Sequence, residues 1–213
     1  MQRRLAILLM VSLLFFGLAV PVYALTLISS YTWGYPTFQH TTWSWVTLDE
    51  NLTSATIKLY NELVDNETDE KPPVFGLTFN DTTYTEMLID LANNKFSFWI
   101  IPQGSEANKW CAASNKPWNF SNPLVIEFDN QELTIYEYGN DTILVQVTLG
   151  DVSLIKYGAR GTDGHYPATA GYLKAEVYRG VGALSIDVTP FMTLAVTVAM
   201  LTIVIGFVKK AVR

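Results

Sequence analysis

The chain has 213 residues, 14 basic and 20 acidic; all the acidic residues but only nine basic ones lie between positions 25 and 187. This segment therefore carries a net charge of −11, which excludes nucleic acid as a partner, because phosphates need a basic face, and argues against docking on anionic lipid. The single cysteine excludes an internal disulfide framework, so hydrophobic burial must hold the fold together.

The N-terminus has the pattern of a secretory signal peptide. Arg3 and Arg4 precede an uncharged apolar stretch over 5–20, and small residues at Val22 and Ala24 form an A-x-A-like cleavage site. A charged start, a short apolar middle and a small-residue exit are typical of a removable leader. We therefore predict a signal peptide over 1–24 and a mature protein that begins at Leu25, with an uncleaved anchor as the alternative.

The first part of the mature chain predicts strands over 25–29, 43–48 and 96–101, which are rich in aromatic and β-branched residues. Two further segments, 55–63 and 83–92, fit either a strand or a helix. The second of them carries the capping-box spacing of a helix start, but it also fits a strand that ends in a turn.

Aromatic residues crowd the region before and within the second of these strands. Trp33, Tyr35, Trp43 and Trp45 fall within thirteen positions, and they predict either an exposed platform for stacking on sugars or protein, or ordinary sandwich core. The usual burial of large aromatic side chains favours the core.

Cys111 stands between Trp110 and Ala112. These half-apolar surroundings favour a buried structural thiol over a bridge to another chain. The two histidines, His40 and His165, have no metal-ligand spacing, so we expect no metal site and no cofactor.

The second half of the chain predicts consecutive strands over 124–128, 132–138, 143–149, 152–157 and 172–178. Apolar and polar residues alternate in them with a period of two, and Gly, Asn and Asp mark the turns between them. Short strands at this spacing predict an all-β fold, an antiparallel, jelly-roll-like β-sandwich.

The run Val125-Ile126-Glu127-Phe128-Asp129, followed by Leu133-Thr134-Ile135-Tyr136 and by 143–149, resembles strands of the laminin-G-like or concanavalin-like jelly rolls. That resemblance covers about a third of the segment between the chain ends. It implies a two-sheet sandwich of the type often used to bind glycans or proteins, without implying a particular ligand.

The spacing of Glu127, Asp129 and Glu132 (E-x-D-x-x-E) is similar to the catalytic strand of the laminarinase-type glycoside hydrolases. That resemblance implies a nucleophile and an acid/base carboxylate on one strand face. Here Asp129-Asn130 predicts a turn, which would point Glu132 away from Glu127. We therefore expect solvated hairpin carboxylates at these positions, with hydrolysis as the alternative.

Five Asn-x-Ser/Thr tripeptides without proline in the middle occur in the segment. In a secreted chain they are acceptor sites for N-glycans and mark surface loops. They are Asn51, Asn66, Asn80, Asn119 and Asn140.

The C-terminal segment 188–208 contains no charged residue, and Lys209, Lys210 and Arg213 follow it. Its length matches a bilayer core when it is helical, and positive charges beyond a span indicate the cytoplasmic side. We predict a transmembrane helix over 188–208 in contact with the lipid bilayer, a cytoplasmic tail over 209–213 and an extracytoplasmic domain over 25–187.

Together these features predict a single-pass, membrane-anchored cell-surface or envelope protein. Its β-sandwich would serve recognition of a glycan or protein ligand, or lattice contacts between copies in a homo-oligomer, and we expect it to be non-enzymatic. The alternative is a membrane-tethered glycan-binding protein or a glycoside hydrolase of jelly-roll type.

Overall fold

Alternation of apolar and polar side chains produces most of the strands. In β14 (Tyr172–Arg179), Leu173, Ala175 and Val177 are buried, while Lys174 and Glu176 between them are partly exposed. The computed structural model describes residues 25–66, 71–129, 131–140, 142–162 and 167–180, which lie within one compact unit, Leu25–Gly182.

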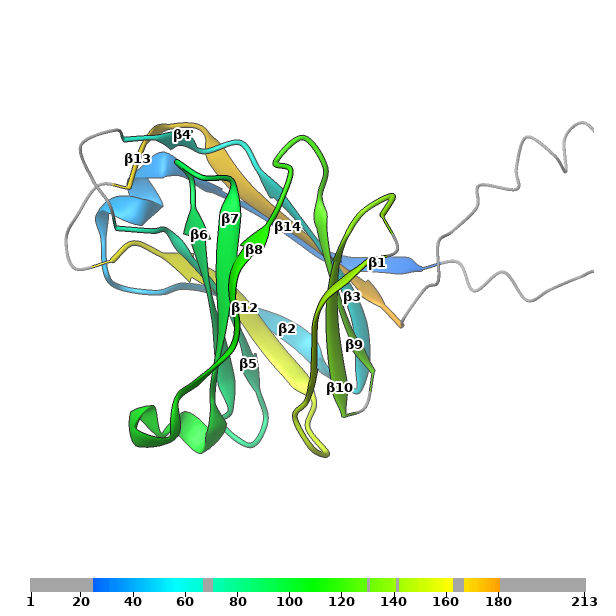
Figure 1. The fold of residues 1–213 in the computed structure, drawn as a ribbon. Helices are drawn as coiled ribbons and strands as arrows, with labels where there is room; N and C mark the ends of the chain where they lie inside the picture. Colours follow the sequence, from blue (N-terminus) through cyan, green and yellow to red (C-terminus); the bar gives the residue numbers. More distant parts are fainter. Residues whose placement is uncertain (1–24, 67–70, 130, 141, 163–166, 181–213) are drawn as a thin grey trace, which may run out of the picture. The chain divides into compact units, whose positions relative to one another are not determined.

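The described residues form two six-stranded antiparallel sheets, and we call these sheet A and sheet B (Figure 1). Sheet A has the spatial order β1 (Thr26–Gly34), β14, β3 (Ser54–Asn61), β9 (Leu124–Asp129), β10 (Glu132–Glu137), β11 (Ile143–Thr148). Sheet B has the order β2 (Ser44–Leu52), β12 (Leu154–Arg160), β5 (Val74–Phe79), β6 (Tyr84–Asp90), β7 (Lys95–Ile101), β8 (Trp110–Pro117).

Smaller elements complete the fold. A two-stranded sheet pairs β4 (Val64–Asp65) with β13 (Ala168–Ala170). Three short 3-10 helices lie in the connections, and they are η1 (Tyr35–Gln39), η2 (Pro102–Gly104) and η3 (Glu106–Asn108).

The hydrophobic core fills the space between the two sheets. Phe79 of β5 and Phe128 of β9 meet across it with ring centroids 5.1 Å apart, and both side chains are fully buried. Burial of a large apolar side chain contributes roughly 1.5–3 kcal/mol. The core therefore joins the sheets without any disulfide.

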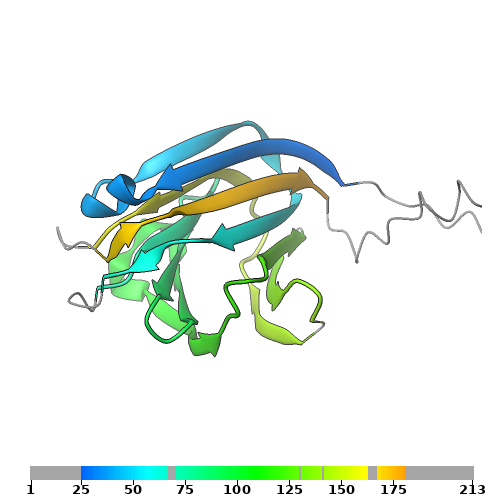
Figure 2. The same cartoon turned by 90° about the horizontal axis from the view of Figure 1, so that it is seen from above.

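The ends of the domain lie beside each other. β1 and β14 pair antiparallel, with Thr26 opposite Arg179 (Figure 2). β14 is also paired on its other side with β3 along seven residues, from Asn61 opposite Leu173 to Ala55 opposite Arg179. The last strand of the domain is thus an interior strand of sheet A.

The structure confirms the predicted antiparallel β-sandwich. The two ambiguous segments, 55–63 and 83–92, contribute strands β3 and β6 and no helix. Among the residues described here, no helix is long and apolar enough to cross a membrane. The predicted signal peptide over 1–24 and the predicted membrane helix over 188–208 lie outside those residues.

Candidate functional site

One row of side chains crosses all six strands of sheet B at matching register positions. Its neighbours along each strand, such as Phe75, Met87 and Phe98, belong to the core, so the row lies on the outer face of the sheet. In order from β2 to β8 the row consists of Trp45, Gly158, Gly76, Glu86, Trp99 and Cys111.

The two glycines of this row make room for a pair of stacked tryptophans. A Cβ on Gly76 would lie 2.6 Å from the Trp43 ring, and a Cβ on Gly158 would lie 2.5 Å from the Trp45 ring. The rings therefore rest against bare backbone. They stack on each other with centroids 4.3 Å apart and planes 18° apart.

Cations lie against the tryptophans. The Lys156 ammonium is 4.7 Å from the centroid of Trp45, and the Arg160 guanidinium is 5.0 Å from that of Trp43. Further along the row, the Lys109 ammonium is 5.4 Å from the centroid of Trp99. Cation–π contacts of this kind add to stability and fix where each charged group sits.

Glu86 connects the cation beside Trp43, which is Arg160, to the cation beside Trp99, which is Lys109. One carboxylate oxygen accepts a hydrogen bond from Lys109 Nζ at 2.5 Å, and the other accepts one from Arg160 at 2.8 Å. The residue is only 4% exposed. Burial by itself would raise the pKa of Glu86, but the bonds to Lys109 and Arg160 outweigh it and hold the pKa below its ordinary value.

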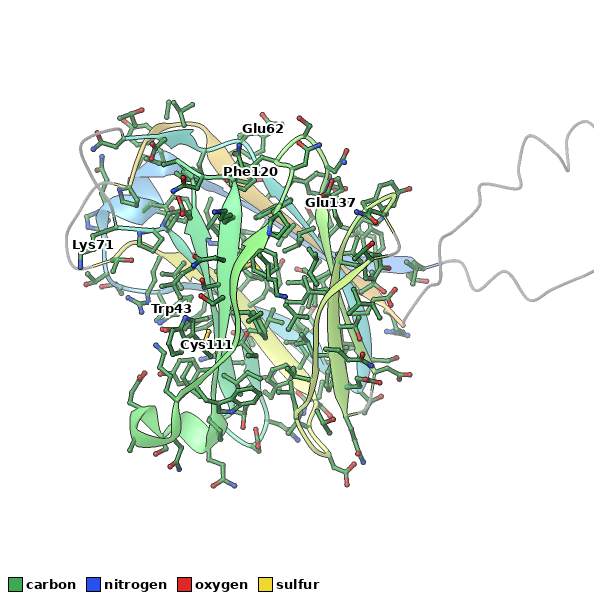
Figure 3. The ribbon with its side chains drawn as sticks, viewed as in Figure 1. Trp43, Glu62, Lys71, Cys111, Phe120 and Glu137 are labelled. Carbon is green, nitrogen blue, oxygen red and sulfur yellow. The ribbon has the colours of Figure 1, made fainter. Side chains whose placement is uncertain are left out.

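These contacts form a continuous array that we call the tryptophan ladder. Trp43 and Cys111 mark its side of the molecule in Figure 3, whereas Glu137 belongs to sheet A. In order of contact, the ladder consists of Lys156, Trp45, Trp43, Arg160, Glu86, Lys109 and Trp99.

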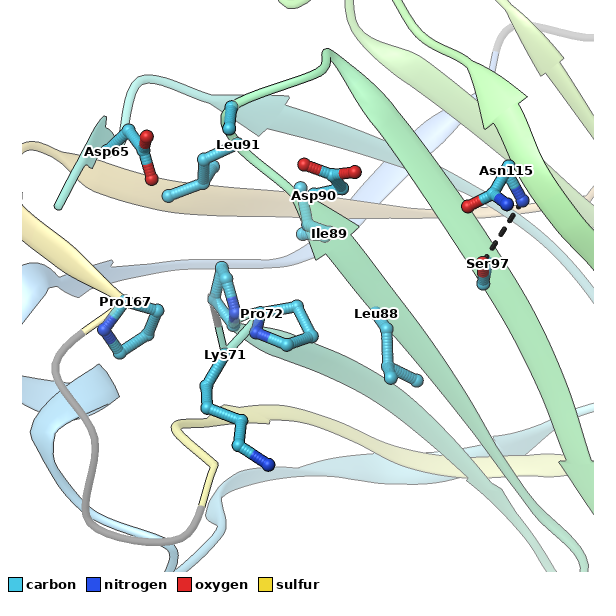
Figure 4. Close-up of a pocket in the computed structure, with 12 residues that line it drawn as sticks. Asp65, Lys71, Pro72, Leu88, Ile89, Asp90, Leu91, Ser97, Asn115 and Pro167 are labelled. Atoms are coloured by element: carbon cyan, nitrogen blue, oxygen red, sulfur yellow. Dashed lines mark hydrogen bonds between the residues drawn. The ribbon is translucent and has the colours of Figure 1, made fainter. Parts of the chain in front are cut away.

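A pocket of about 220 Å³ opens next to the ladder (Figure 4). Leu88 and Ser97, which line it, are the next outward positions after Glu86 on β6 and before Trp99 on β7. Asp90 and Asn115 add polar groups, and the chain before β5, including Lys71, forms the opposite wall. Ladder and pocket thus share one face of sheet B.

The four aromatic residues singled out in the sequence do not form one patch. Trp33 is a core residue, 1% exposed, and packs edge-on against Tyr157 at 5.7 Å. An exposed patch that includes Trp33 is therefore wrong, because its position on β1 points it between the sheets. Tyr35 is exposed in η1, and Trp43 and Trp45 lie half-buried in the ladder.

The prediction of a buried thiol at Cys111 is wrong. Its position at the outer end of the cross-strand row, on the edge strand β8, leaves the residue exposed. The thiol donates to the carbonyl of Ala113 at 3.1 Å.

The three carboxylates of the E-x-D-x-x-E spacing lie on the outer face of sheet A, away from the ladder. The predicted turn does separate Glu127 on β9 from Glu132 on β10, with Asp129 opposite Glu132. The expectation that the turn would point Glu132 away is wrong, because paired residues of antiparallel strands share a face.

Each of these glutamates has its own partner. Glu127 accepts a hydrogen bond from Tyr136 at 2.9 Å, whereas Glu132 pairs with Gln146. Burial raises the pKa of Glu127, the bond from Tyr136 lowers it, and the nearby charge of Asp129 raises it; the net direction is upward.

Four of the five glycosylation tripeptides present an exposed asparagine, namely Asn51, Asn80, Asn119 and Asn140, and Asn66 is half-buried. Within the parts of the chain that the structure describes, no group of His, Cys, Asp and Glu side chains could hold a metal ion.

Local sequence reasoning missed Glu86, Lys109, Lys156 and Arg160. Lys156 and Arg160 share the outer face of β12, but Glu86 comes from β6 and Lys109 from the loop after η3, so no spacing along the chain connects all four. Gly76 and Gly158, which lie inside strands, could have indicated the position of this site, because glycine inside a strand often marks a close approach of another group.

No family model and no curated protein matches the chain. Among solved structures, it is similar to a fructofuranosidase variant from Schwanniomyces occidentalis complexed with fructosylnystose, with a TM-score of 0.50 and 8% identity over 74% of this chain and 34% of that one. The chain thus spans about a third of that enzyme's length.

Weaker likenesses connect it to the galectin LEC-6 from Caenorhabditis elegans and to the carbohydrate-binding module CBM66 from Bacillus subtilis. The galectin has a TM-score of 0.39 and 11% identity, over 70% of this chain and 94% of that one. The module has a TM-score of 0.39 and 9% identity, over 73% of this chain and 94% of that one.

The likeness to the fructofuranosidase corrects one expectation. The chain was expected to be non-enzymatic, but its β-sandwich fold is one that occurs within a glycoside hydrolase, so that exclusion does not stand. At 8% identity the likeness shows a shared fold and nothing beyond the fold.

Proposed function

We propose that the outer face of sheet B binds carbohydrate. The observation that carries this proposal is the tryptophan ladder, in which aromatic surface and charged hydrogen-bonding groups alternate across neighbouring strands. Sugars present the same alternation, because their rings have apolar C–H faces and a rim of hydroxyl groups. A site with aromatic surface and a few well-placed polar groups is the usual form of a small-ligand site.

The polar groups of the ladder are held in place by one another. The ion pairs of Glu86 with Lys109 and Arg160 fix the two cationic donors that hydroxyl groups would meet. Preorganised groups lose little conformational entropy on binding, which favours affinity. Trp43 is covered by Trp45 on one face and by Arg160 on the other, so its part is to hold the guanidinium in place.

Trp45 offers the stacking surface. Its ring meets Trp43 on one face and the Lys156 ammonium on the other. Since a lysine stem is flexible, a sugar ring can take its place against Trp45 while the ammonium turns to bond a sugar oxygen.

The pocket beyond Glu86 extends the site. Its 220 Å³ falls below the roughly 300–1,000 Å³ typical of pockets for drug-sized ligands, and fits a single sugar ring. Ladder and pocket together therefore suit an oligosaccharide. The Schwanniomyces fructofuranosidase variant, a third of which shares this fold, is complexed as a whole with fructosylnystose, and an oligosaccharide is the ligand class proposed here.

We propose further that this domain is displayed outside the cell or envelope, tethered by the apolar segment 188–208 after removal of residues 1–24. Terminal sequencing tests the leader, and carbonate extraction of membranes tests the anchor. A protein that retains Met1 or leaves the membrane in carbonate contradicts this placement.

Carbohydrate binding is tested with the full chain in mild detergent against a panel of immobilised oligosaccharides. We expect at least one binder, whose affinity falls about tenfold in Trp45→Ala, as expected for loss of an aromatic contact. Tyr178→Ala, an aromatic change on sheet A, is the matched control. Equal losses in both variants, or no binder, would contradict the proposal.

Hydrolysis is the second candidate function, and the raised pKa of Glu127 beside Asp129 favours it. A carboxyl group whose pKa is raised, close to a second carboxyl group, is the pairing from which glycosidases build their acid/base residue. Release of reducing ends from the oligosaccharides that bind, abolished in Glu127→Gln, would support it. Release that survives this substitution would remove Glu127 from that role.

A further inference from the structure

The ladder is positively charged in an acidic domain. It contains the cations Lys156, Arg160 and Lys109 and the carboxylate of Glu86. When Glu106 is also counted, whose carboxylate lies 3.9 Å from Lys109, an excess of one positive charge remains. Residues 25–187 as a whole carry −11. Local excess of one sign against the opposite background steers ligands of complementary charge to that place.

Glu86 neutralises only part of this charge. Both of its oxygens are used, one by Lys109 and one by Arg160. The buried Nε of Arg160 has no hydrogen-bond partner among the described residues. This atom is enclosed, so it offers no donor to a ligand on the surface.

Lys156 has no carboxylate partner within the described ranges. Its ammonium lies over Trp45, at the end of the ladder away from Glu86. The facing residues on the neighbouring strands are Thr47 of β2 and Thr78 of β5, which are neutral. A cation beside an aromatic surface, with no anion of its own, is suited to a ligand that supplies one.

From this charge pattern we infer that the carbohydrate is acidic, bearing a carboxylate or sulfate group that pairs with Lys156 while its ring contacts Trp45. This inference rests on the proposed function of the same face. Uronic acids, sialic acids and sulfated sugars share the required chemistry.

The experiment compares matched probes that differ only in charge. Binding of oligogalacturonate and of its methyl ester, and of sulfated and unsulfated forms of one further oligosaccharide, is measured with the full chain in mild detergent. Each is measured at low and at physiological salt. The variants are Lys156→Gln and the control Lys58→Gln, which removes a cation that lies over tyrosine rings on sheet A.

We expect at least one acidic probe to bind at least tenfold more tightly than its neutral partner, and added salt to weaken it. Lys156→Gln should reduce that affinity about tenfold, because it removes one hydrogen bond to a charged group. Lys58→Gln should leave the affinity unchanged. If neutral and acidic probes bind alike and Lys156→Gln has no effect, the inference fails while carbohydrate binding stands.

Two other outcomes also count against the inference. If no oligosaccharide of either kind binds, the proposed function falls with it. If polyglutamate binds as tightly as the acidic sugars and depends on Lys156 to the same degree, the face recognises negative charge in general, and the assignment to acidic sugars is wrong.

Discussion

The outer faces of the two sheets each hold a shielded glutamate, but they surround it differently. On sheet A, Glu176 accepts hydrogen bonds from Lys174, Tyr178 and Tyr60. The first two are its neighbours on β14, and the third lies on the adjacent strand. On sheet B, Glu86 is held by residues 23 and 74 positions away.

The contacts of Glu176 mainly join neighbours on one strand, whereas the contacts of Glu86 bring side chains from distant parts of the chain to one place on the sheet. Period-two geometry alone brings the side chains at positions 174, 176 and 178 to one face. The ladder on sheet B needs several strands in register, two glycines that leave room for tryptophan rings, and a lysine delivered by the loop after η3. The ladder on sheet B therefore brings aromatic and charged side chains together from distant parts of the chain. The network on sheet A is local, and tyrosine hydroxyl groups supply part of it.

Removal of the two glutamates should show the contrast most strongly. Glu86→Ala leaves two cations without their partner, and should cost about 2–3 kcal/mol, somewhat below the usual range for a broken buried pair because both cations can reach water. Glu176→Ala should cost about 1 kcal/mol, since its partners are more exposed. Urea unfolding followed by tryptophan fluorescence measures both. Equal costs would refute the distinction between the two faces.

The glycines under the tryptophans provide the next test. Gly76→Ala brings a Cβ to 2.6 Å from the Trp43 ring and 2.9 Å from the carbonyl of Thr85, which should cost about 1–2 kcal/mol and disturb carbohydrate binding. The control Gly34→Ala places its Cβ at 3.4 Å from Pro36, and should leave stability within about 0.5 kcal/mol. A harmless Gly76→Ala would mean that the stacked rings do not depend on bare backbone.

A pH series tests the ion pairs of the ladder. Because the pKa of Glu86 is lowered from its ordinary value of 4.5 in the fold, its stabilising contribution is complete above that ordinary value. It is lost as the pH falls through the lowered value. Unfolding midpoints between pH 3 and 7 should therefore decline more steeply in acid for the native chain than for Glu86→Gln. Parallel curves would show that Glu86 does not carry this dependence.

The smallest effect is expected at Glu127. Its raised pKa means that the fold favours the protonated form, so its favourable contribution is present at low pH and is lost as the pH rises through the folded value. At pH 7 the ionised group opposes folding slightly. Glu127→Gln, which can still accept the bond from Tyr136, should raise the melting temperature by about 1–3 °C. A lower melting temperature would contradict this reading.

The strands were readable from the sequence because each one carries its own pattern. The alternation of Leu173, Ala175 and Val177 predicts β14 without reference to the rest of the chain. Sequence 83–92 is ambiguous because it carries the capping-box spacing of a helix start and also fits a strand that ends in a turn. Only its pairing between β5 and β7 decides for a strand.

The candidate site could be predicted only in part. Trp43 and Trp45 are two positions apart, so their shared face follows from strand geometry. From the sequence, Trp33 is an equally good candidate for an exposed aromatic surface, yet its side chain lies on the inner face of sheet A. Glu86 and Arg160 become partners through the register of three strands, β12, β5 and β6, and register across a sheet is a property of the whole fold.

The position of β14 has a mechanical consequence. Because the strand is hydrogen-bonded to β1 on one side and to β3 on the other, a pull along the strand loads the hydrogen bonds on both of its sides in shear. An edge strand would peel away one bond at a time, whereas β14 would have to slide out between two neighbours. β14 should therefore resist a pull along its length better than an edge strand would.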